Sequence, residues 1–450
     1  MKAGSPVKVS LVSLGCARTL VDSEVALGGL KEAGYEIVRD VRDADVAVVN
    51  TCGFIEEAKV ESIETILRLC QLKKQGRLTA VVVLGCLAQR HGEELRKEIG
   101  DEVDGIVGTD SFGDLARVLE PLRKKEKVFE VKAKPRYLLN ADTPRYTLTP
   151  EHLAYVKISE GCINACSYCV IPRMKGAHRS RLPEDVLAEI KGLGERGRVS
   201  EINLIGQDTA AYGYDLDRTF KLPDLLRRID ALGAARWVRL LYAHPGHVSE
   251  DLIDAIADSP GLCKYVDFPI EHSHDAMLTR MNRGVTRAKM LWGIETLRKK
   301  MPQVALRTTV IVGFPGETEE EFKDLMDFLK DVRFERLGTF IYSPEEGARS
   351  LNMPDPVPQE LKQQRFNAVM AQQQEISQSI NDGFLGKEIE VLVEEKDAEK
   401  EGLYYGRTQA DAPEVDCQVI LETASPLGIG NFIRARVTDA LEYDLVASPL

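Results

Sequence analysis

Short apolar runs alternate with amphipathic stretches through the first part of the chain. Three valine-rich runs have the length of strands: residues 9–14, 45–50 and 79–84. Residues 22–33 and 56–74 repeat their apolar positions with a helical period. Strands of a parallel sheet are nearly continuous apolar runs because helices cover both faces of the sheet. The pattern therefore predicts a doubly wound parallel α/β domain over residues 1–120.

The alternation of strand-like and helical segments stops at a charged segment and then resumes. Residues 121–150 contain a lysine- and arginine-rich run and prolines without a sustained period, which predicts a linker. Six further strand-like runs follow it: residues 155–158, 201–205, 237–241, 265–269, 305–312 and 336–342. Helical stretches fall between them, such as residues 183–196, 250–258 and 318–330. Six such units predict a partial (β/α)6 barrel over residues 151–383, with its working face at the carboxyl ends of the strands.

The last part of the chain changes from helical to strand-like periodicity. Residues 361–379 are polar and glutamine-rich with helical propensity, and short β runs follow at 388–393, 415–421 and 432–440. They predict a helix that leads into a small antiparallel β-barrel over residues 384–450. No apolar run approaches the about 18 residues of a membrane span, and the N-terminus lacks a secretory signal pattern. We therefore expect a cytoplasmic protein with no membrane partner.

Three cysteines crowd into one short stretch directly after the first predicted strand of the barrel. They are Cys162, Cys166 and Cys169, and the neighbouring Gly161 and Pro172 favour a loop over a helix. Three thiolates can hold an iron-sulfur cluster and leave one position open for a substrate. Structural zinc is the alternative, but it needs four ligands and no second cysteine pair stands at the right distance. His178 is the nearest residue that can complete such a zinc site.

Each of the three strands predicted near the N-terminus is followed at once by a cysteine. These are Cys16, Cys52 and Cys86. Because parallel strands end at one edge of the sheet, residues that are far apart in the sequence meet there. The placement predicts a second iron-sulfur cluster with three protein ligands, and ordinary packing of buried cysteines is the alternative. The other three cysteines, Cys70, Cys263 and Cys417, lack a partner motif, and we expect them to pack in the core.

The cysteine spacing at 162–169 resembles that of the radical S-adenosylmethionine (SAM) superfamily, in which three thiolates hold a 4Fe-4S cluster and SAM chelates the fourth iron. The resemblance implies that Tyr168 lies against the adenine. It also implies SAM contacts at the ends of later strands: Gly206, Gln207, Gly313 and Gly316. Each of these four has a plainer role as a turn residue, and Thr318 and Glu321 form a capping box.

Arg307 lies inside a predicted barrel strand between apolar neighbours. An unpaired guanidinium is costly in such a place, so Arg307 must have an acidic partner. The resemblance to radical SAM enzymes makes the carboxylate of SAM one candidate. An acidic residue of the protein itself is the other, and the sequence leaves both open.

With two sets of three cysteines, the whole chain resembles the radical SAM methylthiotransferases, which combine a three-cysteine domain, a radical SAM barrel and a C-terminal TRAM barrel. The segments 15–24, 50–56 and 205–213 resemble the branch that modifies a protein, although a serine is frequent where Gly206 stands. The resemblance implies methylthio transfer to the β-carbon of an aspartate in the small-subunit ribosomal protein numbered twelve. It also implies two 4Fe-4S clusters, SAM and an electron donor such as flavodoxin or ferredoxin, and the sulfur donor stays unknown.

The distribution of charge distinguishes a protein-modifying enzyme from the alternative functions. The chain carries a net charge of −12, and residues 384–450 hold fourteen acidic against six basic side chains. A barrel that binds RNA is expected to be basic, whereas an acidic barrel suits a basic ribosomal protein. A tRNA methylthiotransferase is therefore the less favoured enzyme, although surface acids can also serve solubility alone. An iron-sulfur electron carrier without turnover is the second alternative, and it predicts no SAM binding.

Overall fold

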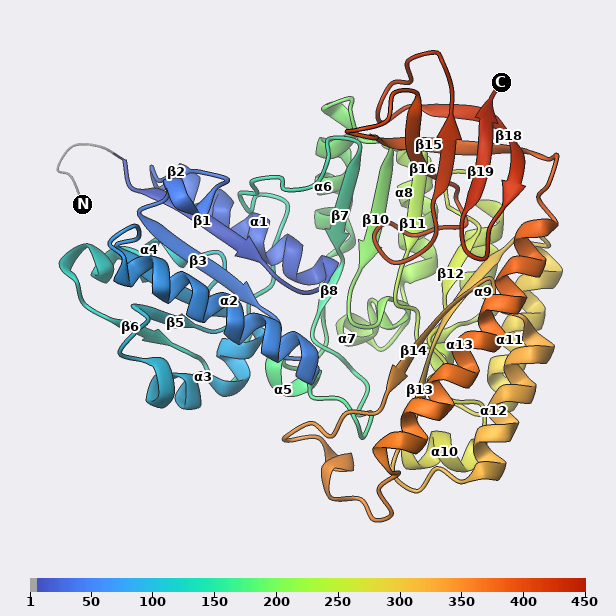
Figure 1. Ribbon diagram of the computed structural model, residues 1–450, viewed down its shortest axis with the longest axis horizontal. Helices are drawn as coiled ribbons and strands as arrows, with labels where there is room; N and C mark the ends of the chain where they lie inside the picture. Colours follow the sequence, from blue (N-terminus) through green and yellow to red (C-terminus); the bar gives the residue numbers. More distant parts are fainter. Residues whose placement is uncertain (1–5) are drawn as a thin grey trace.

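The computed structural model describes residues 6–450. Residues 1–5, the start of the segment in which we expected no secretory signal, lie outside the described part. Three units follow one another: an α/β unit from blue to teal, a larger barrel from green to orange, and a small β-barrel in red (Figure 1). None of the described helices is both long enough and apolar enough to cross a bilayer.

The N-terminal unit is a six-stranded parallel sheet in the order β2-β1-β3-β4-β5-β6. Its strands are β1 (Lys8–Ser13), β2 (Glu36–Ile37), β3 (Val46–Thr51), β4 (Ala80–Gly85), β5 (Gly105–Val107) and β6 (Val128–Glu130). Its helices are α1 (Ala17–Glu32), α2 (Glu56–Lys74), α3 (Cys86–Ile99) and α4 (Leu115–Leu119), with short 3-10 turns at Val41–Asp43 and Glu120–Lys124. The strand β6 lies within the segment that we predicted to be a linker, and it pairs with β5.

Alternate residues of each strand in this sheet point to opposite faces, and helices cover both. Val46 and Val82 pack with residues of α1 and α4, whereas Val49 and Val83 pack with residues of α2 and α3. A sheet buried on both sides needs apolar residues at every strand position, which is the pattern of the sequence. The predicted doubly wound architecture is confirmed.

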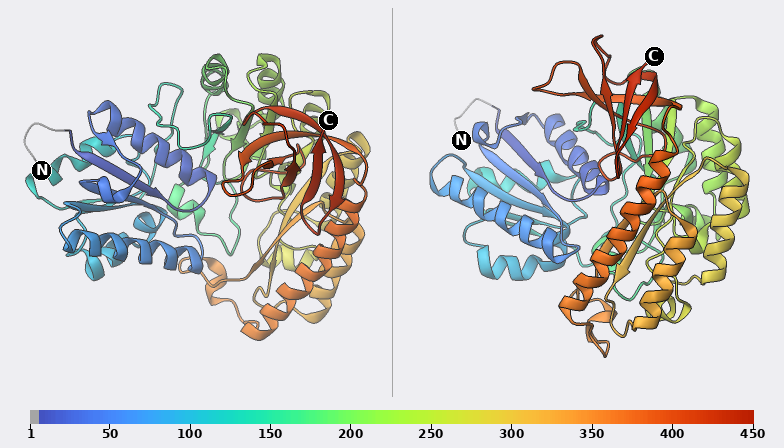
Figure 2. Two further views of the ribbon diagram at one scale, coloured as in Figure 1. Left: turned by 45° about the horizontal axis from the view of Figure 1, so that its top comes forward. Right: turned by 45° about the vertical axis from the view of Figure 1, so that its right-hand side comes forward.

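The central unit is an open barrel of six parallel strands (Figure 2). The strands are β7 (Leu153–Lys157), β10 (Glu201–Ile205), β11 (Trp237–Leu240), β12 (Tyr265–Asp267), β13 (Ala305–Val312) and β14 (Arg336–Ile341). They form two three-stranded sheets, β11-β10-β7 and β12-β13-β14, which one parallel bridge between Val238 and Leu262 connects. All six strands match runs that the sequence predicted, so the partial barrel is confirmed.

Helices cover the outer face of this barrel and connect its strands (Figures 1 and 2). The longer ones are α6 (Pro183–Glu195), α8 (Leu222–Leu232), α9 (Glu250–Asp258), α11 (Arg287–Lys300) and α12 (Glu319–Val332). Shorter elements are α5 (Ile171–Lys175), α7 (Tyr214–Asp217), α10 (Asp275–Arg280), the strand pair β8 (Ser159–Glu160) and β9 (Arg179–Ser180), and 3-10 turns at Thr209–Ala211, Pro245–His247 and Arg349–Asn352. The predicted capping box is present at α12, where Thr318 and Glu321 satisfy each other's backbone N–H groups.

The polar helix α13 (Gln359–Asp382) leads from this barrel into the C-terminal one, as predicted. The C-terminal barrel is closed in the order β15-β16-β17-β19-β18. Its strands are β15 (Glu388–Lys396), β16 (Leu403–Arg407), β17 (Val419–Glu422), β18 (Phe432–Ala440) and β19 (Leu445–Pro449). All neighbouring pairs are antiparallel except β17 with β19, which are parallel.

The small barrel docks where the strands of the large barrel begin. Trp237, the first residue of β11, packs edge-on against Phe432 with ring centroids 4.7 Å apart. Glu201, the first residue of β10, accepts hydrogen bonds from Arg239 Nε at 2.7 Å and from Arg407 Nη2 of the small barrel at 2.6 Å. All three charged side chains are buried. Docking therefore rests on aromatic packing and a buried ionic network, and it leaves the carboxyl ends of the strands to the N-terminal unit.

Replacing Glu201 by glutamine should weaken this docking strongly. The glutamine keeps one oxygen acceptor, places an NH2 donor against the other arginine and removes the negative charge between the two buried guanidinium groups. Breaking a buried pair in this way costs about 3–5 kcal/mol. In a Trp292→Phe background, Trp237 is the only tryptophan, so its fluorescence during urea unfolding reports the docking interface. Asp327→Asn, which breaks the exposed pair with Lys323, should shift the same transition by less than about 1 kcal/mol. Equal effects of the two substitutions would contradict the prediction.

Candidate functional site

The structure places Cys16, Cys52 and Cys86 at one edge of the N-terminal sheet, as the sequence predicted. Cys16 precedes α1, Cys52 follows β3, and Cys86 is the first residue of α3 directly after β4. Two glycines make the turns before the outer cysteines. Gly15 has φ +97°, and a Cβ there would lie 3.1 Å from Cβ of Cys52. Gly85 has φ +102°, and a Cβ there would lie 2.2 Å from the Asn50 side chain.

The three thiols of this edge differ in acidity. Burial raises the pKa of Cys86 to about 12, against the opposing charge of Lys175, and burial also raises the pKa of Cys52. Burial acts in the same direction on Cys16, but the charge and the N–H group of Arg18 overcome it and lower the pKa of that thiol to about 6. Arg18 Nε lies 3.4 Å from the Cys16 sulfur. Cys16 is therefore a ready thiolate, whereas Cys86 and Cys52 must lose their protons on binding a metal.

Cys162, Cys166 and Cys169 lie in a loop beyond β8, as their neighbours in the sequence indicated. Gly161 has φ +71°, and a Cβ there would lie 2.1 Å from the Ala177 carbonyl oxygen. Burial raises the pKa of Cys162 to about 11 and that of Cys169 to about 12. The Ile171 N–H points at the Cys169 sulfur, and Arg283 Nη1 points at the Cys166 sulfur. Both distances from nitrogen to sulfur are 3.5 Å. Such donors favour sulfur in its negatively charged, metal-bound form.

The geometry of both cysteine sets fits a cluster better than a single zinc ion. Around tetrahedral zinc, ligand sulfurs lie roughly 4 Å apart because each Zn–S bond is about 2.3 Å long. Among the described residues, two groups of three side chains place their metal-binding atoms within 4.8 Å of one another. Neither group contains a cysteine. His178, the residue that could complete a zinc site, instead contacts Ser180 Oγ at 3.1 Å through Nε2. A cluster that takes each thiolate on its own iron suits this wider spacing.

The residues expected around SAM lie in two places. Gly206 follows β10, and a Cβ there would lie 2.7 Å from Ser159 Oγ of β8. The neighbouring Gln207 has a buried Oε1 without a hydrogen-bond partner in the structure, which leaves an acceptor for a ligand. Tyr168 packs against the apolar cluster that contains Met277 and Phe314, and burial raises its pKa well above the ordinary value. Gln207 therefore offers an acceptor to a ligand N–H group, and Tyr168 offers an aromatic face from beside the turn after β13.

Gly313 and Gly316 form a left-handed turn after β13, with φ +75° at each. The Gly313 N–H donates to Glu317 Oε2 at 2.7 Å, and a Cβ on Gly313 would lie 2.3 Å from Lys362 of α13. The Gly316 N–H donates to the Asp355 carbonyl at 2.8 Å. The turn and the close approach of α13 therefore explain both glycines without a ligand.

Arg307 has the second of the two partners that the sequence left open. Its guanidinium pairs with Asp267 Oδ1 and, from the small barrel, with Asp416 Oδ1, each at 3.2 Å. It lies in the first half of β13, toward the end where the small barrel docks. Protein acids thus satisfy its charge, and the structure gives no support to the SAM contact that we expected for it.

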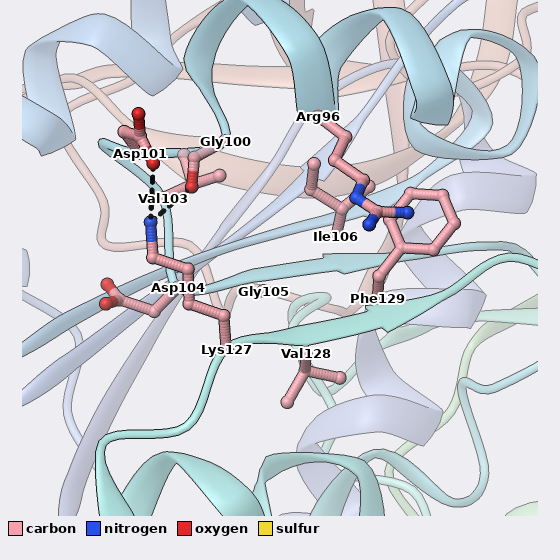
Figure 3. A pocket seen from close by; sticks show the side chains of 10 residues that line it. All are labelled: Arg96, Gly100, Asp101, Val103, Asp104, Gly105, Ile106, Lys127, Val128 and Phe129. Atoms are coloured by element: carbon pink, nitrogen blue, oxygen red, sulfur yellow. Dashed lines mark hydrogen bonds and ion pairs between the residues drawn. The ribbon is translucent and has the colours of Figure 1, made fainter.

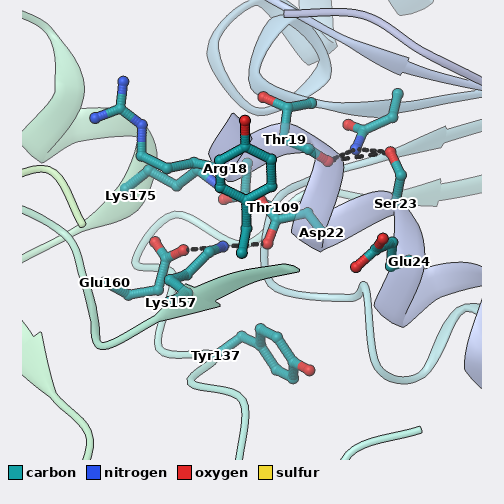
Figure 4. A network of polar contacts seen from close by, with 12 residues as sticks. Arg18, Thr19, Asp22, Ser23, Glu24, Thr109, Tyr137, Lys157, Glu160 and Lys175 are labelled. Atoms are coloured by element: carbon teal, nitrogen blue, oxygen red, sulfur yellow. Dashed lines mark hydrogen bonds and ion pairs between the residues drawn. The ribbon is translucent and has the colours of Figure 1, made fainter. Parts of the chain in front are cut away.

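Sequence reasoning missed a buried ionic network between the N-terminal unit and the large barrel (Figure 4). Asp22 of α1 pairs with Lys157 of β7 and with Lys175 of α5, the latter at 2.7 Å. Lys157 also pairs with Glu160 of β8 at 2.5 Å. A lysine inside a buried strand was the available signal, the same one that drew attention to Arg307. The network fixes the two cysteine-bearing units against each other.

The two cysteine sets face each other across this interface. Cys86 packs against a cluster of Val170, which directly follows Cys169, Met174 and Ala348, and Arg18 Nη1 donates to the Gly206 carbonyl at 3.0 Å. Asp208, which follows Gln207, accepts hydrogen bonds at 2.7 Å from Asn164 and pairs with His247. The carboxyl ends of both sheets thereby line one region, as we expected from the strand ends.

A pocket elsewhere on the N-terminal unit has none of these features (Figure 3). It lies where β5 and β6 begin, at the edge of the sheet opposite the cysteines, and Arg96, Asp104 and Phe129 are among its lining residues. Lys127 spans it, donating to the Gly100 carbonyl at 2.5 Å. The charged groups of the pocket have ionic partners in Asp101, Lys73 and Glu93, so we do not regard the pocket as a reaction site.

Known families match three successive parts of the chain. Residues 8–108 match a family described as uncharacterized protein family UPF0004, residues 156–329 match the radical SAM superfamily, and residues 385–450 match the TRAM domain. Among solved structures, the radical SAM methyltransferase TsrM from Kitasatospora setae aligns with a TM-score of 0.55 at 17% identity over 75% of each chain. The cobalamin-dependent radical SAM enzyme OxsB aligns with a TM-score of 0.50 at 13% identity, over 82% of this chain and 56% of that one. These structures support the fold alone.

Curated relatives match nearly the whole chain. A protein of Clostridioides difficile named ribosomal protein uS12 methylthiotransferase RimO is 44% identical over 444 residues, 99% of both chains. Proteins of the same name from Thermoanaerobacter and from Geotalea uraniireducens are 45% and 46% identical, over 97% and 98% of this chain and 99% and 97% of their own lengths. At this identity and coverage, the chain belongs to the RimO family of radical SAM methylthiotransferases.

Proposed function

We propose that this chain adds a methylthio group to the β-carbon of an aspartate in ribosomal protein uS12, the small-subunit protein numbered twelve. The proposal rests on one observation, namely that two sets of three cysteines face each other across the interface of two units in a chain of the RimO family. The expected cofactors, SAM and two 4Fe-4S clusters, are confirmed for the family. We assign one cluster to Cys162, Cys166 and Cys169 and the other to Cys16, Cys52 and Cys86.

The reaction needs a radical because the C–H bond at the β-carbon is not acidic enough for an ordinary base. When bound, the first cluster with SAM supplies a radical that removes this hydrogen, and the second cluster with a further SAM supplies the methylthio group. The protein itself positions the reactants and excludes water. Gln207 offers its orphan acceptor to a SAM N–H group, and Tyr168 offers an aromatic face to the adenine. We do not include Arg307 in this SAM site.

The small barrel suits a basic protein substrate. Eight of its acids are exposed, against five exposed basic residues, so its surface stays acidic. Three further acids, Glu394, Asp411 and Asp416, instead pair with arginines where the barrel docks. An acidic surface attracts a basic ribosomal protein and repels the phosphates of tRNA. We further propose a cytoplasmic enzyme that takes electrons from a donor of the flavodoxin or ferredoxin class, with the two barrels at 151–383 and 384–450. Because β6 belongs to the N-terminal sheet, we extend the N-terminal domain from the expected limit of 120 to Glu130 and shorten the linker accordingly.

The substrate is tested with the full-length protein, reconstituted anaerobically with iron and sulfide. The enzyme is incubated with SAM and a reductant, with uS12 in one arm and tRNA in the other, and both products are analysed by mass spectrometry. We expect a methylthio mass gain on one aspartate of uS12 and none on tRNA. A gain on tRNA alone would contradict the substrate assignment. An electron carrier without turnover would bind no SAM and would form no 5′-deoxyadenosine in either arm.

A further inference from the structure

Arg18 carries a positive charge that no carboxylate neutralises in the described part of the chain. It lies on the first turn of α1, and its Nε and Nη1 donate to the Cys16 sulfur and to the Gly206 carbonyl. Its guanidinium carbon lies 4.2 Å from the centroid of the Tyr242 ring. Nη2 has no acceptor among the described groups and is not buried, so a ligand can reach it. Five N–H donors in one plane make arginine suited to carboxylates.

The acids nearest to Arg18 already have partners. Asp22, one turn further along α1, pairs with Lys157 and Lys175, and Glu160 pairs with Lys157 (Figure 4). The two acids and the two lysines form a group without net charge. No carboxylate is therefore left for Arg18 at the interface of the two units. The anion that it contacts is the Cys16 thiolate, which shares its charge with iron when the cluster is bound. A half-buried cation of this kind attracts an anion.

Tyr242 is held in a strained conformation beneath this guanidinium. Its φ of +63° lies in the left-handed region, which non-glycine residues rarely adopt. Hydrogen bonds fix the residue there: its N–H donates to Asp267 Oδ2 at 3.0 Å, and its carbonyl accepts from the Thr209 N–H at 3.0 Å. Strain that the surrounding structure maintains is typical of ligand-binding sites. The Tyr242 ring therefore holds one face of the Arg18 guanidinium in place.

We propose that Arg18 binds the side-chain carboxylate of the substrate aspartate, and this inference rests on the proposed function. The carbon that is modified must meet both cysteine sets, and its carboxylate is attached to it directly. The binding group must therefore lie between the two sets. Arg18 lies there, in contact with Cys16 of one set and with Gly206, which follows the strand next to the other set. Arg18 is thus a specificity-determining residue: it distinguishes a negatively charged side chain at the modified position from a neutral one.

The carboxylate of SAM is the alternative ligand for Arg18, because it has the same charge and the same acceptor atoms as the aspartate side chain. The substrate is favoured because Arg18 belongs to the N-terminal unit and contacts a cysteine of the sulfur-presenting set. Tyr168 and the set that binds SAM come from the other unit. The two sources predict different losses, so binding of SAM and binding of uS12 are measured separately on each variant.

The test compares charge on the enzyme with charge on the substrate. Full-length enzyme with both clusters is titrated with uS12 and with uS12 in which the modified aspartate is asparagine. The wild-type enzyme should prefer the aspartate form by about tenfold or more, the usual worth of a hydrogen-bonded charge pair. In Arg18→Gln this preference should fall to within about twofold, while Arg18→Lys should keep part of it because it restores the charge. A purely structural role of Arg18 would weaken both forms equally and preserve the preference.

Arg90→Gln is the matched control. Arg90 also joins the two units, through Glu345 at 2.8 Å, but it contacts no cysteine. This variant should keep the preference for aspartate. An undiminished preference in Arg18→Gln would overturn the proposal, as would a loss of SAM binding with the preference retained. If the wild-type enzyme binds neither form of uS12, the proposed function fails instead.

Discussion

Cys52→Ala should abolish methylthio transfer to uS12 while the enzyme still cleaves SAM. Cys52 lies between Cys16 and Cys86 at the edge of the N-terminal sheet, on the turn after β3. Its removal leaves two thiolates for the second cluster, and the sulfur that this cluster presents is lost. The loop that carries Cys162, Cys166 and Cys169 belongs to another unit and keeps its three ligands. We expect product to fall below about one thousandth of the wild-type amount, the scale of losing an essential cofactor group.

The measurement is a single reaction analysed for two products. Mass spectrometry of uS12 quantifies the methylthio group, and chromatography quantifies 5′-deoxyadenosine. Cys70→Ala is the matched control, because Cys70 is buried in the core between α2 and the sheet and faces no other cysteine of the described chain. The control should retain both products. Methylthio transfer by Cys52→Ala at the level of the control would refute the role of Cys52 as a cluster ligand.

Cys166→Ala should abolish both products. Cys166 is the buried member of its set, and Arg283 Nη1 donates to its sulfur. With two thiolates left, the first cluster cannot be held in a form that cleaves SAM, so no radical forms and the β-hydrogen of the aspartate stays in place. We expect 5′-deoxyadenosine to fall to the background of a reaction without enzyme, a loss of more than about a thousandfold.

Iron content distinguishes a lost cluster from a misfolded protein in Cys166→Ala. The reconstituted variant should bind about half of the iron of the wild type, because the set on the N-terminal sheet is intact. Its circular dichroism spectrum should match that of Cys70→Ala. The free energies of unfolding of the two variants should agree within about 1 kcal/mol. SAM cleavage by Cys166→Ala at the level of Cys70→Ala would contradict the assignment of the first cluster.

The elements of this fold could be predicted from the sequence because they depend on local patterns. Continuous valine-rich runs predicted β3 and β4, and the spacing of apolar residues predicted α2 with the limits that the structure shows. The capping box of Thr318 and Glu321 joins residues three apart, so neighbours in the sequence suffice to recognise it. The cysteine edge followed from one topological rule, that parallel strands end on the same side.

Partners that come from another part of the chain could not be predicted in this way. Arg307 needed an acid, but Asp416 lies 109 positions away in the small barrel and reaches it only after that barrel has docked. The glycines at 313 and 316 are typical of a ligand-binding turn, and the structure adds a role that the sequence does not show: Gly313 makes room for Lys362 of α13. Such contacts depend on how whole units pack, and a local pattern carries no information about that.

The sequence by itself determined which residues form strands and helices, the two sets of cysteines and the family, since these follow from short-range periodicity and motif spacing. Only the tertiary structure decided what lies between the two sets. Asp22 pairs with lysines of the other unit, and Arg18 reaches Gly206 from 188 positions away without a carboxylate partner. The physical reason is that charge compensation is a property of the assembled interface: a residue is paired or unpaired only once every neighbouring unit is in place.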